Sequence, residues 1–170
     1  MKTFQQFIDD IPELDESSMS RIKAQSDKGG TAVMSASRGN LSKKENRARA
    51  KKLDRDIRGK FGKGATKVTG KYDEKDEKTG QTKRVKERSH VIQSGKMGKR
   101  KFKKAVKSLG KKYGQDSVIT QQKGDKGATL KRTRKGGLPK RNIKLGKMRP
   151  GRSGENETQK KGKTFTYDTK

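Results

Sequence analysis

Apolar residues are sparse along this chain, and their spacing predicts several short elements rather than one long one. The five apolar residues within 1–16 recur at helical intervals, which predicts a short acidic amphipathic helix at the amino end. Residues 17–40 are rich in Ser, Gly, Ala and Lys without a sustained period, which predicts a flexible linker. The apolar face of the first helix consists of Phe4, Phe7, Ile8, Ile11 and Leu14.

A basic helix is expected in the next segment, residues 41–63. Ser42 and Glu45 have the spacing of a capping box, which would begin a helix at residue 43. Gly59 would end the helix after residue 58. A thin apolar stripe runs along this helix, and Lys and Arg occupy most of its remaining circumference. The pattern therefore predicts one face docked on a core and the rest exposed.

Residues 64–133 carry the most domain-like pattern of the chain. Two stretches of strand composition on each side of one clear amphipathic helix predict a hairpin, a helix and a second hairpin. The sequence thus predicts an α+β fold class: a small ββαββ domain preceded by a basic helix, with flexible basic linker and tail segments. In chain order, the expected elements are strands 66–72 and 84–92, helix 97–113, and strands 117–121 and 128–132.

The last segment, 134–170, returns to a basic composition interrupted by Gly and Pro. This composition predicts a flexible tail. Residues 164–167 alternate between polar and aromatic side chains, which predicts one edge strand within the tail.

Charge dominates the composition: 48 Lys and Arg against 19 Asp and Glu give a net charge of +29, and only 24% of the residues are hydrophobic. Such a field attracts polyanions, so nucleic acid is the first partner to consider. Few aromatic residues accompany the basic clusters, which favours contact with the backbone of double-stranded DNA over stacking on bases. The candidate phosphate contacts are Lys43, Lys44, Arg47, Arg49, Lys51, Lys52, Lys99, Arg100, Lys101, Lys103, Lys104, Lys131, Arg132 and Arg134.

Residues suited to catalysis are few. The chain has no cysteine and a single histidine, His90, which excludes thiolate sites and His clusters for a metal. His90 has acidic and basic neighbours in an expected strand, yet a lone histidine of this kind more often simply packs or faces solvent. No phosphate-loop fingerprint and no bilayer-spanning apolar run occur. The sequence therefore predicts no catalytic residue, metal site or cofactor, no membrane partner, and a protein that is not an enzyme.

The first ten residues, MKTFQQFIDD, resemble the capsid-targeting leader of internal head proteins of T-even-type tailed phages, including cyanobacterial phages. In that family the leader enters the prohead with the scaffold, and the prohead protease removes it after Leu or Ile, any residue, then Glu. The resemblance covers residues 1–16 and implies the prohead scaffold and protease as partners. Leu14 and Glu16 are the first and last residues of the preferred cleavage tripeptide. Cleavage after Glu16 would leave a chain that begins at Ser17.

Together the leader and the charge predict an internal head protein of a phage that binds and neutralises the packaged genome without sequence preference. Such a protein would lie in the capsid interior, and in the host cytoplasm during assembly and after any injection with the genome. Three alternatives stay open at this point. They are an injected effector that binds a host protein, a structural cofactor of capsid, neck or tail, and a ribosome-associated RNA-binding protein.

Overall fold

The computed structural model describes residues 13–76, 78–137, 139–151, 156–160 and 163–167. The helices in this part of the chain are α2 (Glu13–Lys28), α3 (Lys43–Phe61) and α4 (Lys99–Lys112). Its strands are β1 (Thr31–Ser35), β2 (Thr66–Lys75), β3 (Thr82–Gln93), β4 (Ser117–Gln121), β5 (Ala128–Arg132), β6 (Ile143–Gly146), β7 (Met148–Pro150), β8 (Asn156–Lys160) and β9 (Lys163–Tyr167).

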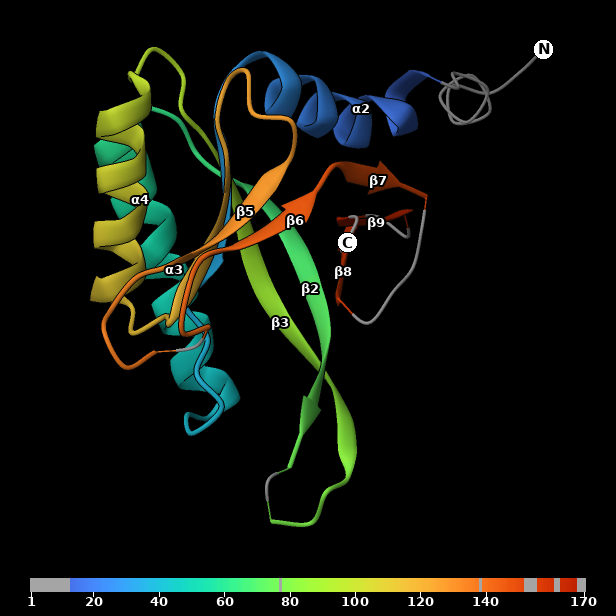
Figure 1. Cartoon of the computed structure of the whole chain (residues 1–170), viewed down its shortest axis with the longest axis vertical. Coiled ribbons are helices and arrows are strands. Elements are labelled where there is room, and N and C mark those ends of the chain that lie inside the picture. Colours follow the sequence, from blue (N-terminus) through green and yellow to red (C-terminus); the bar gives the residue numbers. More distant parts are fainter. Residues whose placement is uncertain (1–12, 77, 138, 152–155, 161–162, 168–170) are drawn as a thin grey trace, which may run out of the picture.

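All nine described strands join one antiparallel sheet in the order β6-β5-β4-β1-β3-β2-β8-β9-β7. The two edge strands, β6 and β7, are consecutive in the sequence, and only Lys147 separates them. Because the chain passes directly from one edge of the sheet to the other, the sheet must curl until its edges approach (Figure 1). The result is a nearly closed, barrel-like sheet with a concave inner face.

The predicted fold class, a small ββαββ domain, is wrong. The two predicted hairpins exist as β2–β3 and β4–β5, but β1 lies between them and pairs with both β3 and β4. Val33 illustrates this position, because it stands opposite Val91 on one side and Ile119 on the other. The molecule is therefore mostly β structure, built on one continuous sheet rather than on a four-strand unit.

The predicted linker at 17–40 is also wrong, because most of α2 and all of β1 fall within it. Every residue of β1 is buried. A strand covered on both faces lacks the alternation of polar and apolar residues that identifies a half-exposed strand. Small residues such as Ala32 and Ser35 then give this segment the composition of a linker.

The predicted flexible tail at 134–170 contains four strands, β6 to β9. The edge strand expected at 164–167 corresponds to β9, which has β8 on one side and β7 on the other and is therefore internal. Sequence reasoning missed these strands because each is three to five residues long and Gly or Pro lies near their ends.

Helices α3 and α4 lie side by side against the outer face of the sheet (Figure 1). The capping box of Ser42 and Glu45 is present and begins α3 at residue 43, as predicted. The helix continues past Gly59 and ends at Gly62, whose positive φ of 71° suits glycine. The core between helices and sheet includes Leu53, Ile57, Ile92, Phe102, Val106, Leu109 and Val118.

Helix α2 covers one end of the barrel. Its Ile22 is buried among apolar residues of the inner face, and its Ser26 hydroxyl lies 3.0 Å from that of Thr31 at the start of β1. The predicted leader helix lies outside the described residues up to residue 12, and the cleavage residues Leu14, Glu16 and Ser17 fall within α2. Capsid targeting and cleavage stay predictions.

Among the described residues, none of the helices has the length and apolar character needed to cross a membrane.

Candidate active site on the concave face

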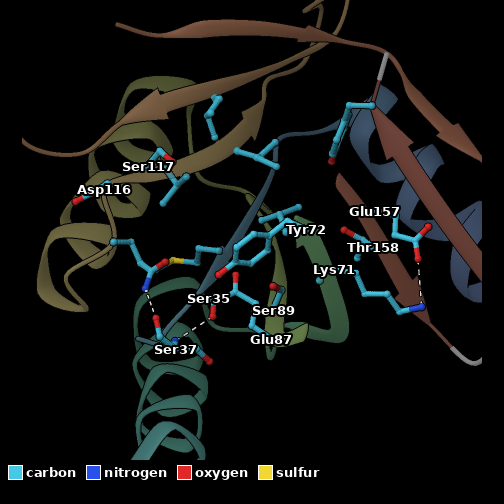
Figure 2. A pocket seen from close by; sticks show the side chains of 18 of the residues that line it. Ser35, Ser37, Lys71, Tyr72, Glu87, Ser89, Asp116, Ser117, Glu157 and Thr158 are labelled. Atoms are coloured by element: carbon cyan, nitrogen blue, oxygen red, sulfur yellow. Dashed lines mark hydrogen bonds and ion pairs between the residues drawn. The ribbon is translucent and has the colours of Figure 1, made fainter. Parts of the chain in front are cut away.

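A cavity of about 940 Å³ opens on the concave face of the sheet (Figure 2). Its walls come from strands on both halves of the sheet and from the loops that follow β1 and α4. The volume lies within the range of sites that hold small molecules and cofactors. The curl of the sheet, rather than a gap between domains, thus creates the site.

Polar side chains gather where β1, β2 and β3 run together. Gly70 of β2 stands opposite Glu87 of β3, and Ser35 of β1 stands opposite Ser89. Tyr72 lies two residues beyond Gly70 and therefore on the same face of the sheet. All five residues line the cavity, and Figure 2 shows the side chains of Tyr72, Glu87, Ser35 and Ser89 in one region of it.

Gly70 makes room in this region. A Cβ atom at this position would lie 3.0 Å from the Ser89 hydroxyl oxygen and 3.6 Å from Cγ of Glu87. A glycine inside a strand often marks the close approach of a ligand or of another backbone. The space between the carboxylate of Glu87 and the ring of Tyr72 therefore depends on a missing side chain.

The deeper part of the concave face is apolar. Val33, Val68, Val91 and Phe165 are buried there together, and the ring of Phe165 meets that of Tyr167 edge to face at 5.9 Å. Burial raises the pKa of Tyr167 well above its usual value, so this hydroxyl stays protonated at neutral pH. Val33 and Phe165 line the cavity together with Tyr167, so this part of its wall offers a ligand an apolar surface.

Most of the charged groups around the cavity are paired with one another. Lys71 Nζ lies 3.2 Å from an oxygen of Glu157 (Figure 2), and Arg134 Nε donates to Asp116 at 2.7 Å. Arg38 instead donates to a backbone oxygen, that of Gly114, at 2.6 Å. Among the described residues no group of three His, Cys, Asp or Glu could hold a metal ion.

Comparison with known protein families identifies the family to which this chain belongs. The sequence model of the S-adenosylmethionine lyase family matches residues 32–170, which span the whole sheet and the two outer helices. The chain belongs to the S-adenosylmethionine lyase family. No curated protein matches the chain. A solved structure of a phage S-adenosylmethionine lyase in complex with S-methyl-5'-thioadenosine matches with 21% identity and a TM-score of 0.37, over 58% of this chain and 84% of that one.

Membership of a lyase family overturns the prediction of a non-enzymatic internal head protein that neutralises packaged DNA. The capsid location rested on the same hypothesis and has no support of its own. Most of the basic residues that were predicted to contact phosphate lie outside the cavity, on α3 and α4. The DNA, prohead and host-protein partners stay predictions.

The predicted phosphate contacts do not form a single site in the structure. Arg134 lines the cavity, where it pairs with Asp116. Arg49 is a structural residue, because it donates to the backbone oxygens of Ala36 and Tyr113. The following are exposed on α3 and α4: Lys43, Lys44, Arg47, Lys51, Lys52, Lys99, Arg100, Lys101, Lys103 and Lys104. Lys131 and Arg132 are partly exposed on β5. Their contact with phosphate stays a prediction.

Sequence reasoning missed the residues of the lyase cavity. A weak signal was present, because Gly70 and Tyr72 alternate along one predicted strand and Glu87 and Ser89 along the next. A carboxylate on the inner face of a strand is unusual enough to suggest a site. The large charge of the chain hid it, since Glu87 stands among Lys86 and Arg88.

His90 lies on the other face of the sheet and does not line the lyase cavity. It is fully buried, and neither ring nitrogen has a hydrogen-bond partner in the described part of the chain. Desolvation lowers the pKa of His90; Asp54 opposes this shift, and Lys67 and Arg88 add to it. The residue therefore packs as a neutral side chain beneath the helices.

A buried neutral histidine makes stability depend on pH. In the unfolded chain His90 takes up a proton near its ordinary pKa of about 6.5, whereas in the folded chain it does so only at lower pH. We expect the free energy of unfolding in urea to be smaller at pH 5.5 than at pH 7.5. In His90→Gln this difference should shrink. An unchanged pH dependence in the variant would assign the effect to other groups.

Proposed function

We propose that this chain cleaves S-adenosylmethionine at the bond between the sulfonium sulfur and Cγ of the methionyl group, without adding water. A carboxylate oxygen of the substrate forms a new bond to Cγ, the Cγ–S bond breaks, and its electron pair stays on sulfur. The products are S-methyl-5'-thioadenosine and homoserine lactone. Atoms and charge balance within the substrate itself, so the step needs no cofactor and no proton transfer.

The observation that carries the proposal is the match of the family to residues 32–170, together with an anionic and an aromatic side chain on the cavity wall that those residues form. A sulfonium ion is a cation without N–H or O–H donors, so it is recognised by charge and by aromatic faces. Glu87 supplies the charge and Tyr72 the ring. Gly70 leaves the space between them.

The apolar floor of the cavity supports the same chemistry. The proposed step removes two opposite charges, because a carboxylate and a sulfonium become a neutral ester and a neutral thioether. Water stabilises the charged ground state more than the less charged transition state, so exclusion of water favours reaction. Val33, Ile119 and Phe165 line the cavity and provide the apolar surface against which the substrate can fold. The protein thus acts by orientation and desolvation rather than by acid or base catalysis.

Product analysis in water enriched in ¹⁸O tests the proposal. The purified chain is incubated with S-adenosylmethionine. The products formed at early times are separated, and their masses are measured by mass spectrometry. We expect S-methyl-5'-thioadenosine and an unlabelled lactone to appear together, with homoserine forming only later from the lactone. Homoserine that carries ¹⁸O as the first product would show hydrolysis instead. Absence of S-methyl-5'-thioadenosine would refute the proposal.

The net charge of the protein should affect this reaction. The chain carries +29, and S-adenosylmethionine is singly positive at neutral pH, so long-range repulsion lowers the concentration of substrate near the cavity. Salt screens this repulsion, and we expect kcat/KM to rise by about threefold or more between 0.01 and 0.15 M salt. Inhibition by the neutral product should change little over the same range. A fall in kcat/KM with salt would contradict the electrostatic argument.

A further inference from the structure

One cation that lines the cavity has no acidic partner among the described residues. Lys71 pairs with Glu157 and Arg134 with Asp116, whereas Arg38 forms none of the ion pairs found in this part of the chain. Arg38 is half-buried in the loop between β1 and α3. A partly buried guanidinium without a counter-charge is well suited to receive an anion from a ligand.

The loop holds Arg38 in a fixed position. Its backbone N–H donates to Asn46 Oδ1 at 2.9 Å, and Asn46 Nδ2 donates to the backbone oxygen of Arg38 at 3.0 Å. Its side chain is fixed at the far end, where Nη1 donates to the oxygen of Gly114. Two anchors on the backbone and one on the guanidinium keep the remaining donors of Arg38 at the cavity wall.

Gly114 is part of the same arrangement. Its φ of +67° belongs to the left-handed region, and a Cβ atom there would come within 2.5 Å of Nη1 of Arg38. Any other residue at this position would displace the guanidinium. Glycine at 114 therefore serves both the turn after α4 and the placement of Arg38.

The charges of Arg38 and Glu87 match those at the two ends of the methionyl group of S-adenosylmethionine. Ser35 stands opposite Ser89, and Figure 2 shows Ser37 and Glu87 in the same region of the cavity. The backbone N–H of Ser37 donates to Ser35 Oγ at 3.0 Å, which ties this part of the loop to the strand. Arg38 is the next residue along the chain, and both Arg38 and Glu87 line the cavity, which therefore offers a ligand one cationic and one anionic side chain.

We infer that Arg38 binds the α-carboxylate of S-adenosylmethionine while Glu87 and Tyr72 bind its sulfonium. The identity of the ligand rests on the proposed function. Arg38 can hold one carboxylate oxygen, which leaves the other to attack Cγ. The contact is strongest in the ground state, because the carboxylate loses its charge as the lactone forms. Arg38 is therefore a binding residue whose removal raises KM rather than lowering kcat.

The binding of two unreactive ligands distinguishes carboxylate binding by Arg38 from a general distortion of the cavity in the Arg38 variant. Sinefungin has the carboxylate but no sulfonium leaving group, and decarboxylated S-adenosylmethionine has the sulfonium but no internal nucleophile. The dissociation constant of each is measured by calorimetry for the wild type, Arg38→Gln and a matched control, Arg55→Gln, on the exposed side of α3. Loss of a charge-assisted contact should weaken sinefungin binding to Arg38→Gln by about 10- to 100-fold.

We expect Arg38→Gln to bind decarboxylated S-adenosylmethionine within about twofold of the wild type, since the lost contact involves only the carboxylate. Equal weakening of both ligands, or of neither, would overturn the inference. Neither ligand is turned over, so the result stands apart from the proposed reaction. If the two ligands respond as expected but no S-methyl-5'-thioadenosine forms from S-adenosylmethionine, the carboxylate site stands and the proposed function fails.

Discussion

Replacing Gly70 by valine should lower kcat/KM for S-adenosylmethionine by about 100-fold or more, because misplacing a substrate by about 1 Å can cost this much. The first added atom already meets Ser89 at 3.0 Å, and the two further methyl carbons of valine would occupy the space between Glu87 and Tyr72. Valine favours strand backbone, so the sheet should fold normally. Steady-state kinetics together with urea unfolding measure both effects.

A second glycine provides the control for Gly70. Gly59 lies in α3 with no atom within 4 Å of where its Cβ would stand. Gly59→Ala should leave kcat/KM unchanged and should stabilise the fold by about 0.5–1 kcal/mol, as alanine does in helices. Full activity of Gly70→Val in a folded protein would show that substrate does not occupy this part of the cavity.

Replacing Glu87 by glutamine should lower kcat/KM by about 10- to 100-fold, mainly through a higher KM. The substitution keeps the size of the side chain and removes only its charge. Since the positive charge of the sulfonium disappears during the proposed step, Glu87 stabilises bound substrate at least as much as the transition state. We therefore expect kcat to change much less than KM.

An exposed carboxylate that lies outside the cavity tests whether total charge is responsible. Asp27 of α2 pairs with Lys23 at the surface, and Asp27→Asn changes the net charge by the same amount as Glu87→Gln. Kinetics of Asp27→Asn should match those of the wild type. A loss of kcat with unchanged KM in Glu87→Gln would contradict the assignment of Glu87 to sulfonium binding and would indicate a role in the chemical step.

Local elements of this fold could be predicted from sequence. The helix expected at 97–113 is α4, and the strands expected at 117–121 and 128–132 have those bounds in the structure. Such elements carry their own signals: a stripe of apolar residues on one helix face, or strand-forming residues between turns. The Ser42 capping box is equally local, since its partners are three residues apart.

The arrangement of these elements could not be predicted, because it depends on pairing between distant strands. β1 joins β3 and β4, and β2 joins β8, over long separations in sequence. Nothing in β1 itself indicates which strands flank it, and its complete burial removes the alternation that would have identified it as a strand. The curl of the sheet, and with it the cavity, follows only from these pairings.

The candidate site could not be predicted for the same reason, and charge added a misleading signal. Arg38, Gly70, Glu87 and Gly114 come from separate parts of the sequence and line one cavity only because the sheet curls. Averaged over the chain, a charge of +29 predicts a polyanionic partner. The proposed ligand is a small cation held by one carboxylate. A single acidic residue hardly changes the net charge of the whole chain, so the composition does not indicate such a ligand.

A crystal structure of the chain with S-methyl-5'-thioadenosine would show where the ligand binds. We expect the thioether sulfur to lie between Tyr72 and Glu87, above Gly70, on the concave face of the sheet. The end of the cavity near Arg38 should then stay open, because this product has lost the carboxylate. Density for the ligand on the outer helices, or a ligand-free cavity at saturating concentration, would contradict the account.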